Sequence, residues 1–228
     1  MSNARSTQGN IDMPATGRED ILRLLADTGS PPSLIAHVTD VCDRAMRIVD
    51  QVEAAGIPVD RRVVHTGSLL HDMGIPFQTG EPVDVPELGD LAQGVLTDSL
   101  MHPILGFQVA ERYGFSLAVR RCILCHTPGP TRAECVILGL TPPREEMLPV
   151  AMEEKIVMYA DFVTWCAKLG LNPWRDERVT AEAGLLYFNI FWPRIVGVTL
   201  GPDGNIARRW IDAHREMRIF ARPEWFGV

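Results

Sequence analysis

Apolar residues recur at helical spacing along most of residues 17–170. The segment that Ser33 is expected to cap shows this most clearly, because apolar side chains occupy every third or fourth position from Ile35 to Val52. A helix with this period places its apolar side chains on one face, where a core can bury them. Glycine and proline residues separate the periodic segments. The pattern predicts an all-α protein with helices at 17–27, 34–55, 58–73, 101–113, 116–126, 131–138 and 153–169.

The chain divides into three parts by composition. Residues 1–17 are polar and are expected to form a disordered lead. Residues 18–170 hold the periodic segments, with a loop expected at 77–97, and residues 171–228 form an aromatic-rich extension that we expect to pack on this core. The elements predicted in the extension are a helix at 180–192, a small β-hairpin at 196–210 around a Pro-Asp-Gly turn, and a helix at 211–219. Three interpretations of the extension stay open: a structural addition, a lid over a site, or a homodimer interface.

Composition narrows the range of partners. The chain has 22 Lys and Arg against 29 Asp and Glu, a net charge of -7, which argues against binding nucleic acid or an anionic membrane through its overall field. No apolar run is long enough to span a bilayer. The five cysteines are an odd number, and the N-terminus lacks the apolar run of a signal peptide. We therefore expect a cytoplasmic protein with reduced thiols.

The candidate chemistry lies in the histidines. His71 and Asp72 end a predicted helix, where neighbouring residues point about 100° apart. Such a pair can bind one cation from two sides, or let the carboxylate bridge two cations. His37, His102 and His126 also lie on or at the ends of predicted helices. Each of them taken alone is compatible with an ordinary structural role.

Asp161 is a second indication of a cation. It lies in the helix predicted at 153–169, among apolar residues. An unpaired carboxylate at a buried position is costly, so Asp161 needs a positively charged partner. Lys155, an arginine or a metal ion each meets this need, and the residues alone leave the choice open.

The order of these residues resembles that of the HD superfamily of metal-dependent phosphohydrolases, in which His, His-Asp and Asp follow one another. The matching residues here are His37, His71, Asp72 and Asp161. The segment SLLHDMG at 68–74 resembles the HDIG form of the superfamily, and EEKIVMYADFV at 153–163 resembles its last ligand helix. The resemblance covers about residues 18–170 and implies an HD-domain helical bundle. The chain is also similar to an uncharacterised group of small HDIG-type proteins.

Two further histidines, His102 and His126, resemble the additional ligands of the subset that holds two metals. That subset includes dinucleoside-polyphosphate hydrolases, cyclic-dinucleotide phosphodiesterases and a few diiron oxygenases. The resemblance implies that the first metal is held by His37, His71 and Asp161, the second by His102 and His126, and that Asp72 bridges them. Such ligands suit Fe, Mn, Zn, Co or Ni better than calcium, and the resemblance favours iron or manganese.

One position departs from the hydrolytic members, many of which carry Lys or Arg three residues after the HD aspartate. Ile75 stands there in this chain, which leaves the binding of a phosphate to other side chains. The candidates are Lys155, Arg132 and Arg144. His65 lies seven residues before Asp72, near the same face of the predicted helix, and is a candidate for a supporting contact.

The resemblance implies a phosphohydrolase that acts on a small phosphorylated metabolite or nucleotide. Its catalytic residue would be Asp72, which would fix the place of a metal-bridging hydroxide for attack in line. A diiron oxygenase that cleaves a C–C or C–P bond uses the same six ligands, and a non-catalytic metal- or ligand-binding HD protein is the third hypothesis. Cys122, Cys125 and His126 also fit the C-x-x-C-H pattern of haem attachment, which the expected cytoplasmic location disfavours.

Overall fold

A computed structural model describes residues 17–78, 102–127, 129, 131–133, 145–175 and 205–227, and every regular element in these ranges is a helix. The α-helices are α1 (Arg18–Asp27), α2 (Pro32–Ala54), α3 (Arg61–Leu70), α4 (His102–Arg112), α5 (Leu117–Cys125), α7 (Met152–Lys168) and α10 (Asn205–Met217). Short 3-10 helices are η1 (Ile75–Gln78), η4 (Arg218–Phe220) and η5 (Pro223–Trp225). The predicted all-α fold is confirmed. None of the helices in the described ranges combines the length and the apolar character needed to cross a bilayer.

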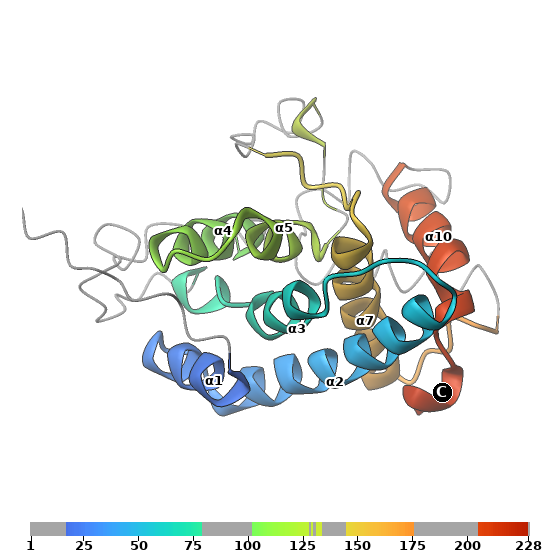
Figure 1. Ribbon diagram of the computed structural model, residues 1–228, viewed down its shortest axis with the longest axis horizontal. Coiled ribbons are helices and arrows are strands. Elements are labelled where there is room, and N and C mark those ends of the chain that lie inside the picture. The colour runs from blue at the N-terminus through green and yellow to red at the C-terminus, as the bar shows by residue number, and fades with distance from the viewer. Residues whose placement is uncertain are drawn as a thin grey trace, which may run out of the picture.

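Helix α3 lies at the centre of the bundle. It contacts α1 and α2 on one side and α5 on the other, and it also contacts α7 (Figure 1). One cluster of buried apolar side chains fills the space between helices α1 to α5. A second lies between α2, α7 and residues 205–227, which we call the C-terminal segment. Because α3 is enclosed by helices, the turn that follows it points into the interior of the protein.

Local hydrogen bonds define where two of the helices begin. The Asp60 side chain accepts hydrogen bonds from the N–H groups of Arg62 and Val63 at the start of α3. Glu154 accepts the N–H groups of Val150 and Ala151 at the start of α7. These contacts satisfy donors that the first turn of a helix leaves without a partner in the helix itself.

The predicted cap of α2 is wrong. The helix begins at Pro32, one residue before Ser33, and no side chain caps it. Proline suits the first helical position because it has no N–H to satisfy and its φ angle is already helical. The other core helices begin and end within a few residues of the predicted positions.

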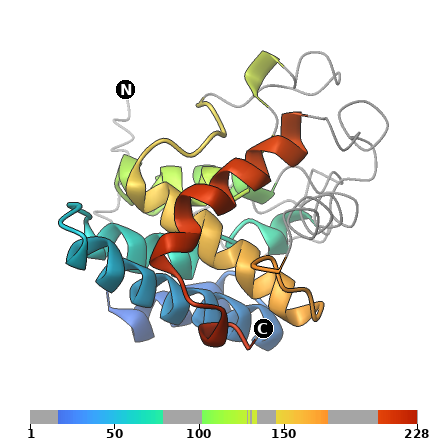
Figure 2. The ribbon, with the colours of Figure 1, turned by 90° about the vertical axis from the view of Figure 1, so that its right-hand side faces the viewer.

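The predicted hairpin at 196–210 is also wrong in its second half. Residues 205–217 form helix α10, because Ile206, Trp210, Ala213 and Met217 recur at helical spacing. The Trp210 ring stacks on Phe162 of α7 with 4.4 Å between the ring centroids. Helix α10 therefore lies across α7 (Figure 2).

Several predicted segments lie outside the described residues. They are the lead at 1–16, the loop beyond residue 78, the helix at 180–192 and the first half of the hairpin. Of the helix predicted at 131–138, residues 131–133 are described, and 132 and 133 are helical.

Candidate metal centre

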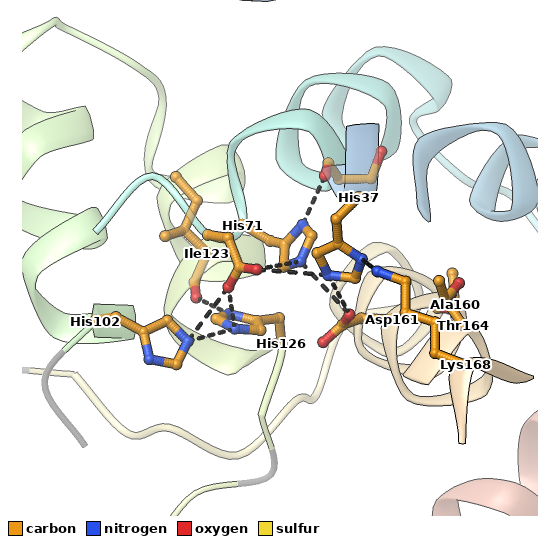
Figure 3. A network of polar contacts seen from close by, with 11 residues as sticks. His37, His71, His102, Ile123, His126, Ala160, Asp161, Thr164 and Lys168 are labelled. Atoms are coloured by element: carbon orange, nitrogen blue, oxygen red, sulfur yellow. Dashed lines mark hydrogen bonds and ion pairs between the residues drawn. The ribbon is translucent and has the colours of Figure 1, made fainter. Parts of the chain in front are cut away.

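Six side chains from different parts of the chain meet between α2, α3, α4, α5 and α7 (Figure 3). They come from α2 (His37), the turn after α3 (His71 and Asp72), the start of α4 (His102), the end of α5 (His126) and the middle of α7 (Asp161). All but His37 are buried. The structure thus brings together the six residues that the resemblance implies as metal ligands.

The carboxylate of Asp72 divides the six residues into two sets. Its Oδ2 atom lies 3.3 Å from Nε2 of His71 and 3.5 Å from Nε2 of His37. Its Oδ1 atom lies 3.4 Å from Nε2 of His102 and 3.4 Å from Nε2 of His126. Each oxygen therefore faces a different pair of imidazoles, as in a carboxylate that bridges two cations.

Asp161 belongs to the set around Oδ2. Its Oδ1 atom lies 3.1 Å from Nε2 of His37 and 3.6 Å from Nε2 of His71. In the other set, the Nε2 atoms of His102 and His126 lie 2.9 Å apart. The nitrogen and oxygen atoms of each set therefore converge on a common centre.

Two of the imidazoles are oriented by the same local contact. Nδ1 of His71 donates to the carbonyl of Ser68 at 2.7 Å, and Nδ1 of His126 donates to the carbonyl of Ile123 at 2.6 Å. Each carbonyl belongs to the residue three positions earlier, at the end of a helix. Because Nδ1 donates, Nε2 of the neutral ring presents a lone pair to the centre.

These lone pairs show that the residues fit a metal ion. Nε2 of His71 is buried and makes no hydrogen bond, although two carboxylates lie near it. Burial lowers the pKa of His126, which keeps that ring neutral, as a metal ligand must be. Imidazole lone pairs and carboxylate oxygens that face one another need a cation between them.

Electrostatics at the centre lead to the same conclusion. Burial lowers the pKa of His71, but the charges of Asp72 and Asp161 outweigh burial and raise it well above its ordinary value. Burial raises the pKa of Asp72, yet the facing imidazoles, His71 first, bring it well below its ordinary value. Burial also raises the pKa of Asp161, and His71 and His37 lower it below its ordinary value. The two carboxylates stay ionised and attract positive charge, either a proton on His71 or a metal ion.

A glycine allows the two sets to approach one another. A Cβ atom added to Gly74 would lie 1.9 Å from the carbonyl oxygen of His102 and 2.6 Å from the N atom of Gly106. The turn that carries Asp72 therefore packs directly on the backbone of α4. This contact gives a physical reason for the glycine two residues after Asp72.

A cavity of about 300 Å³ opens beside the six residues. His37, Asp72, His102 and Asp161 form part of its wall, and the rest is formed by Pro31, Ser33, Leu34, Ile75, Trp165 and Lys168. Lys168 is the one cationic side chain in that wall among the described residues. The sequence reasoning missed it, although it lies seven residues after Asp161 and therefore near the same face of α7.

The other predicted residues lie elsewhere. Lys155 pairs with Glu216 of α10 at 2.6 Å and does not line the cavity. Burial lowers the pKa of His65, and the charges that act on it come from Arg18 and Asp43. The N–H of Arg132 donates to Glu146, and residue 144 lies outside the described residues.

The cysteines of the C-x-x-C-H pattern are part of the core. Cys122 and Cys125 are both buried. Cys125 lies against the carbonyls of Glu146 and Leu148, and a Cβ on Gly67 would lie 2.5 Å from Cβ of Cys122. Burial raises the pKa of both thiols. The packing leaves no room for a haem at these two residues.

Comparison with known proteins agrees with this geometry. A family model described as the HD domain matches residues 34–165, more than half of the chain. The chain belongs to the HD domain family. The match spans His37, the His71-Asp72 pair and Asp161, and it ends within α7. Membership places this HD domain in a superfamily of metal-dependent hydrolases.

Two proteins are similar to this HD domain over more than half of the chain. One is a tRNA (cytidine(56)-2'-O)-methyltransferase of Picrophilus torridus, 31% identical over 63% of this chain and 35% of the relative. The other is an uncharacterized protein of Methanocaldococcus jannaschii, 27% identical over 57% of this chain and 64% of the relative. The matches thus span about a third of the first relative and less than two thirds of the second. No solved structure matches the chain.

Proposed function

We propose that this HD domain is a metal-dependent phosphohydrolase that acts on a small phosphorylated metabolite or nucleotide. The observation that carries the proposal is the carboxylate of Asp72, whose two oxygens face different pairs of imidazoles. A carboxylate placed in this way would be shared by the two ligand sets if each set held a metal ion. Two such ions, when bound, supply Lewis acidity and lower the pKa of a water molecule toward neutrality.

The residues of the chain contribute position and charge. In the proposed site Asp72 fixes the separation of the two sets, and the carbonyls of Ser68 and Ile123 hold the imidazoles of His71 and His126 with their lone pairs inward. Only two of the six ligands are carboxylates, so two divalent ions, if bound, would give the centre a net positive charge. That charge attracts a phosphate group. The cavity of about 300 Å³ has room for a small substrate.

The ligand set also bears on the choice of metal. Four imidazoles and two carboxylates suit iron, manganese, zinc, cobalt or nickel, and iron or manganese is our first choice. The methyltransferase relative is named for a reaction on a nucleotide of tRNA. That name supports the inclusion of nucleotides among the substrates to be tested.

One observation favours a second function. Ile75 lines the cavity at the position where many hydrolytic relatives carry a cation, so part of the wall that would face a phosphate is apolar. A diiron oxygenase that cleaves a C–C or C–P bond would use the same six ligands. Such an enzyme would consume oxygen and would retain a mixed-valent iron pair.

The test is metal analysis of protein purified without oxygen, followed by a panel of phosphomonoesters, phosphodiesters and nucleotides on the same sample. We expect phosphate release from at least one class, and its loss after treatment with a chelator. His65→Gln is the matched control, because it removes a histidine of α3 that lies away from the centre. Oxygen-dependent turnover without release of phosphate from any ester would support the oxygenase instead.

A further inference from the structure

We propose that Lys168 binds the anionic group of the substrate at the mouth of the metal centre, and that metal binding frees it for this role. The inference rests on the proposed function, because it assumes a substrate that carries a phosphate.

In the structure Lys168 contacts a metal-ligand candidate directly. Its ammonium group lies 2.8 Å from Nδ1 of His37 (Figure 3). An ammonium group can only donate, so Nδ1 of His37 must accept, and the proton of this imidazole sits on Nε2. Nε2 is also the atom that faces Asp161 at 3.1 Å.

A metal ion at that position changes the hydrogen bond. An imidazole that binds a metal through Nε2 carries its proton on Nδ1 and becomes a donor there. Two donors would then face each other at Nδ1 of His37, and Lys168 would lose its acceptor. Lys168 is the last residue of α7 and its side chain is exposed, so it can turn away without disturbing the core.

The cavity is the place where a freed Lys168 would meet a ligand. Lys168 lines it together with the apolar side chains of Leu34, Ile75 and Trp165. It is the one cation of the described wall, on the side where His37 and Asp161 lie. The expected ligand is a small molecule with one phosphate group, held between Lys168 and the metals, and an apolar or aromatic remainder against Trp165 and Ile75.

The sequence provides a matched control for this role. The chain has two lysines, Lys155 and Lys168, and both lie on α7. Lys155 has its own carboxylate partner, Glu216, at 2.6 Å. Lys155→Gln and Lys168→Gln change the net charge of the protein by the same amount. A difference between their phosphate affinities therefore reports on the position of the lysine.

The first experiment measures the binding of inorganic phosphate to the metal-loaded protein by calorimetry, together with metal content. We expect Lys168→Gln to bind phosphate about tenfold more weakly, since a charge-assisted hydrogen bond is lost. Lys168→Arg should stay close to wild type, and Lys155→Gln should be unchanged. All of these variants should hold as much metal as the wild type.

Two results with Lys168→Gln would overturn the inference. Equal phosphate affinity of Lys168→Gln and wild type would show that Lys168 does not bind the anion. Loss of metal from Lys168→Gln would show that Lys168 positions His37 instead. A wild-type protein that loads metal, binds no phosphate and releases none from any ester would overturn the proposed function as well, so the two failures are distinguishable.

A second experiment measures chemical labelling of the two lysines. Pyridoxal 5'-phosphate carries a phosphate and an aldehyde; the aldehyde condenses with a lysine amine, with loss of water, and borohydride reduces the imine to a stable product. Peptide mass spectrometry of the metal-loaded protein should find Lys168 labelled, with protection by inorganic phosphate. Labelling of Lys155 should be insensitive to phosphate. Equal protection of both lysines, or protection of neither, would contradict the proposal.

Discussion

Asp72 is the residue on which the proposed chemistry depends most. Its two oxygens face separate pairs of imidazoles, and its buried carboxylate stays ionised. The sequence predicted that Asp72 and the five other residues belong together, because their order follows a known pattern. The sequence could not show which histidines each oxygen of Asp72 faces, since that depends on where α2, α4 and α5 place their histidines.

Lys168 shows the limit of sequence reasoning at this scale. Its contact with His37 joins residues 131 positions apart in the chain. The spacing from Asp161 puts Lys168 near the same face of α7, but it does not reveal the contact with His37, which depends on the packing of α7 against α2. The three cations proposed from the sequence were chosen by their charge alone, and Lys155 turned out to pair with a helix of the extension.

The titration of the centre predicts how metal-free protein responds to pH. The pKa values of Asp72 and Asp161 are lowered, so their stabilisation is present above the ordinary carboxyl pKa of 3.8 and is lost as the pH falls. The pKa of His71 is raised, so its stabilisation is present below the ordinary value of 6.5 and is lost as the pH rises through the raised value. These three groups therefore give the metal-free protein its highest Tm between pH 3.8 and pH 6.5, the ordinary pKa values of the carboxyl and imidazole groups.

Thermal unfolding of chelated and metal-loaded protein across this pH range checks the prediction. Metal should remove the fall in Tm on the alkaline side, because the metal takes the place of the proton on His71. A chelated protein whose Tm rises steadily from pH 6.5 to pH 9 would contradict the assigned direction of the His71 shift.

At the scale of elements, two glycines allow the helices around the metal centre to pack closely. Gly74 lets the turn that carries Asp72 pack against the start of α4, and Gly67 lets α3 approach Cys122 of α5. Buried Glu154 adds a connection, because it pairs with Arg121 of α5 at 2.7 Å while it caps α7. These contacts hold the elements that carry His102, His126 and Asp161 in a fixed relation.

Gly74→Ala tests this close approach. The added methyl group overlaps the carbonyl of His102, so α4 must shift and the set around His102 must open. We expect a loss of stability of about 1–3 kcal/mol, typical of overpacking, and a reduced metal content. Denaturant unfolding and elemental analysis measure the two effects. Gly17→Ala is the control, since its methyl group meets only the flexible carboxylate of Asp20; equal behaviour of the two variants would refute the argument.

Most of the core helices were predictable from periodicity and from their glycine and proline boundaries. Helix α10 was missed, because Pro-Asp-Gly is a turn signal that a strand or a helix can follow. What decides for α10 is the burial of Trp210 against Phe162, a contact with a distant helix. Periodicity at 206–217 was the signal that could have found it.

At the scale of the whole molecule, the C-terminal segment is part of the core that carries Asp161. Trp210, Met217, Phe220 and Phe226 lie in one cluster with the apolar side of α7. None of the described residues that line the cavity comes from 205–227. For the described part of the extension, the packing favours a structural role over that of a lid.

Trp210→Ala should therefore destabilise the whole protein. Removal of a buried aromatic ring costs about 3–5 kcal/mol, and the ring of Phe162 on α7 would lose its partner. Ile219→Ala, at a residue that is 74% exposed, should change stability by less than about 0.5 kcal/mol. Chemical denaturation of both variants measures the difference. A Trp210→Ala variant as stable as the control would mean that α10 contributes little to the core.

The number of metal ions per chain tests the central claim most directly. Elemental analysis should compare protein purified without oxygen with the variants His126→Ala and Asp72→Ala, and with His65→Gln as the control. We predict about two ions in the wild type and the control, about one in His126→Ala because one set is broken, and fewer still in Asp72→Ala because both sets share this carboxylate. A wild type that holds a single ion, or a His126→Ala variant that keeps two, would contradict the two-metal centre.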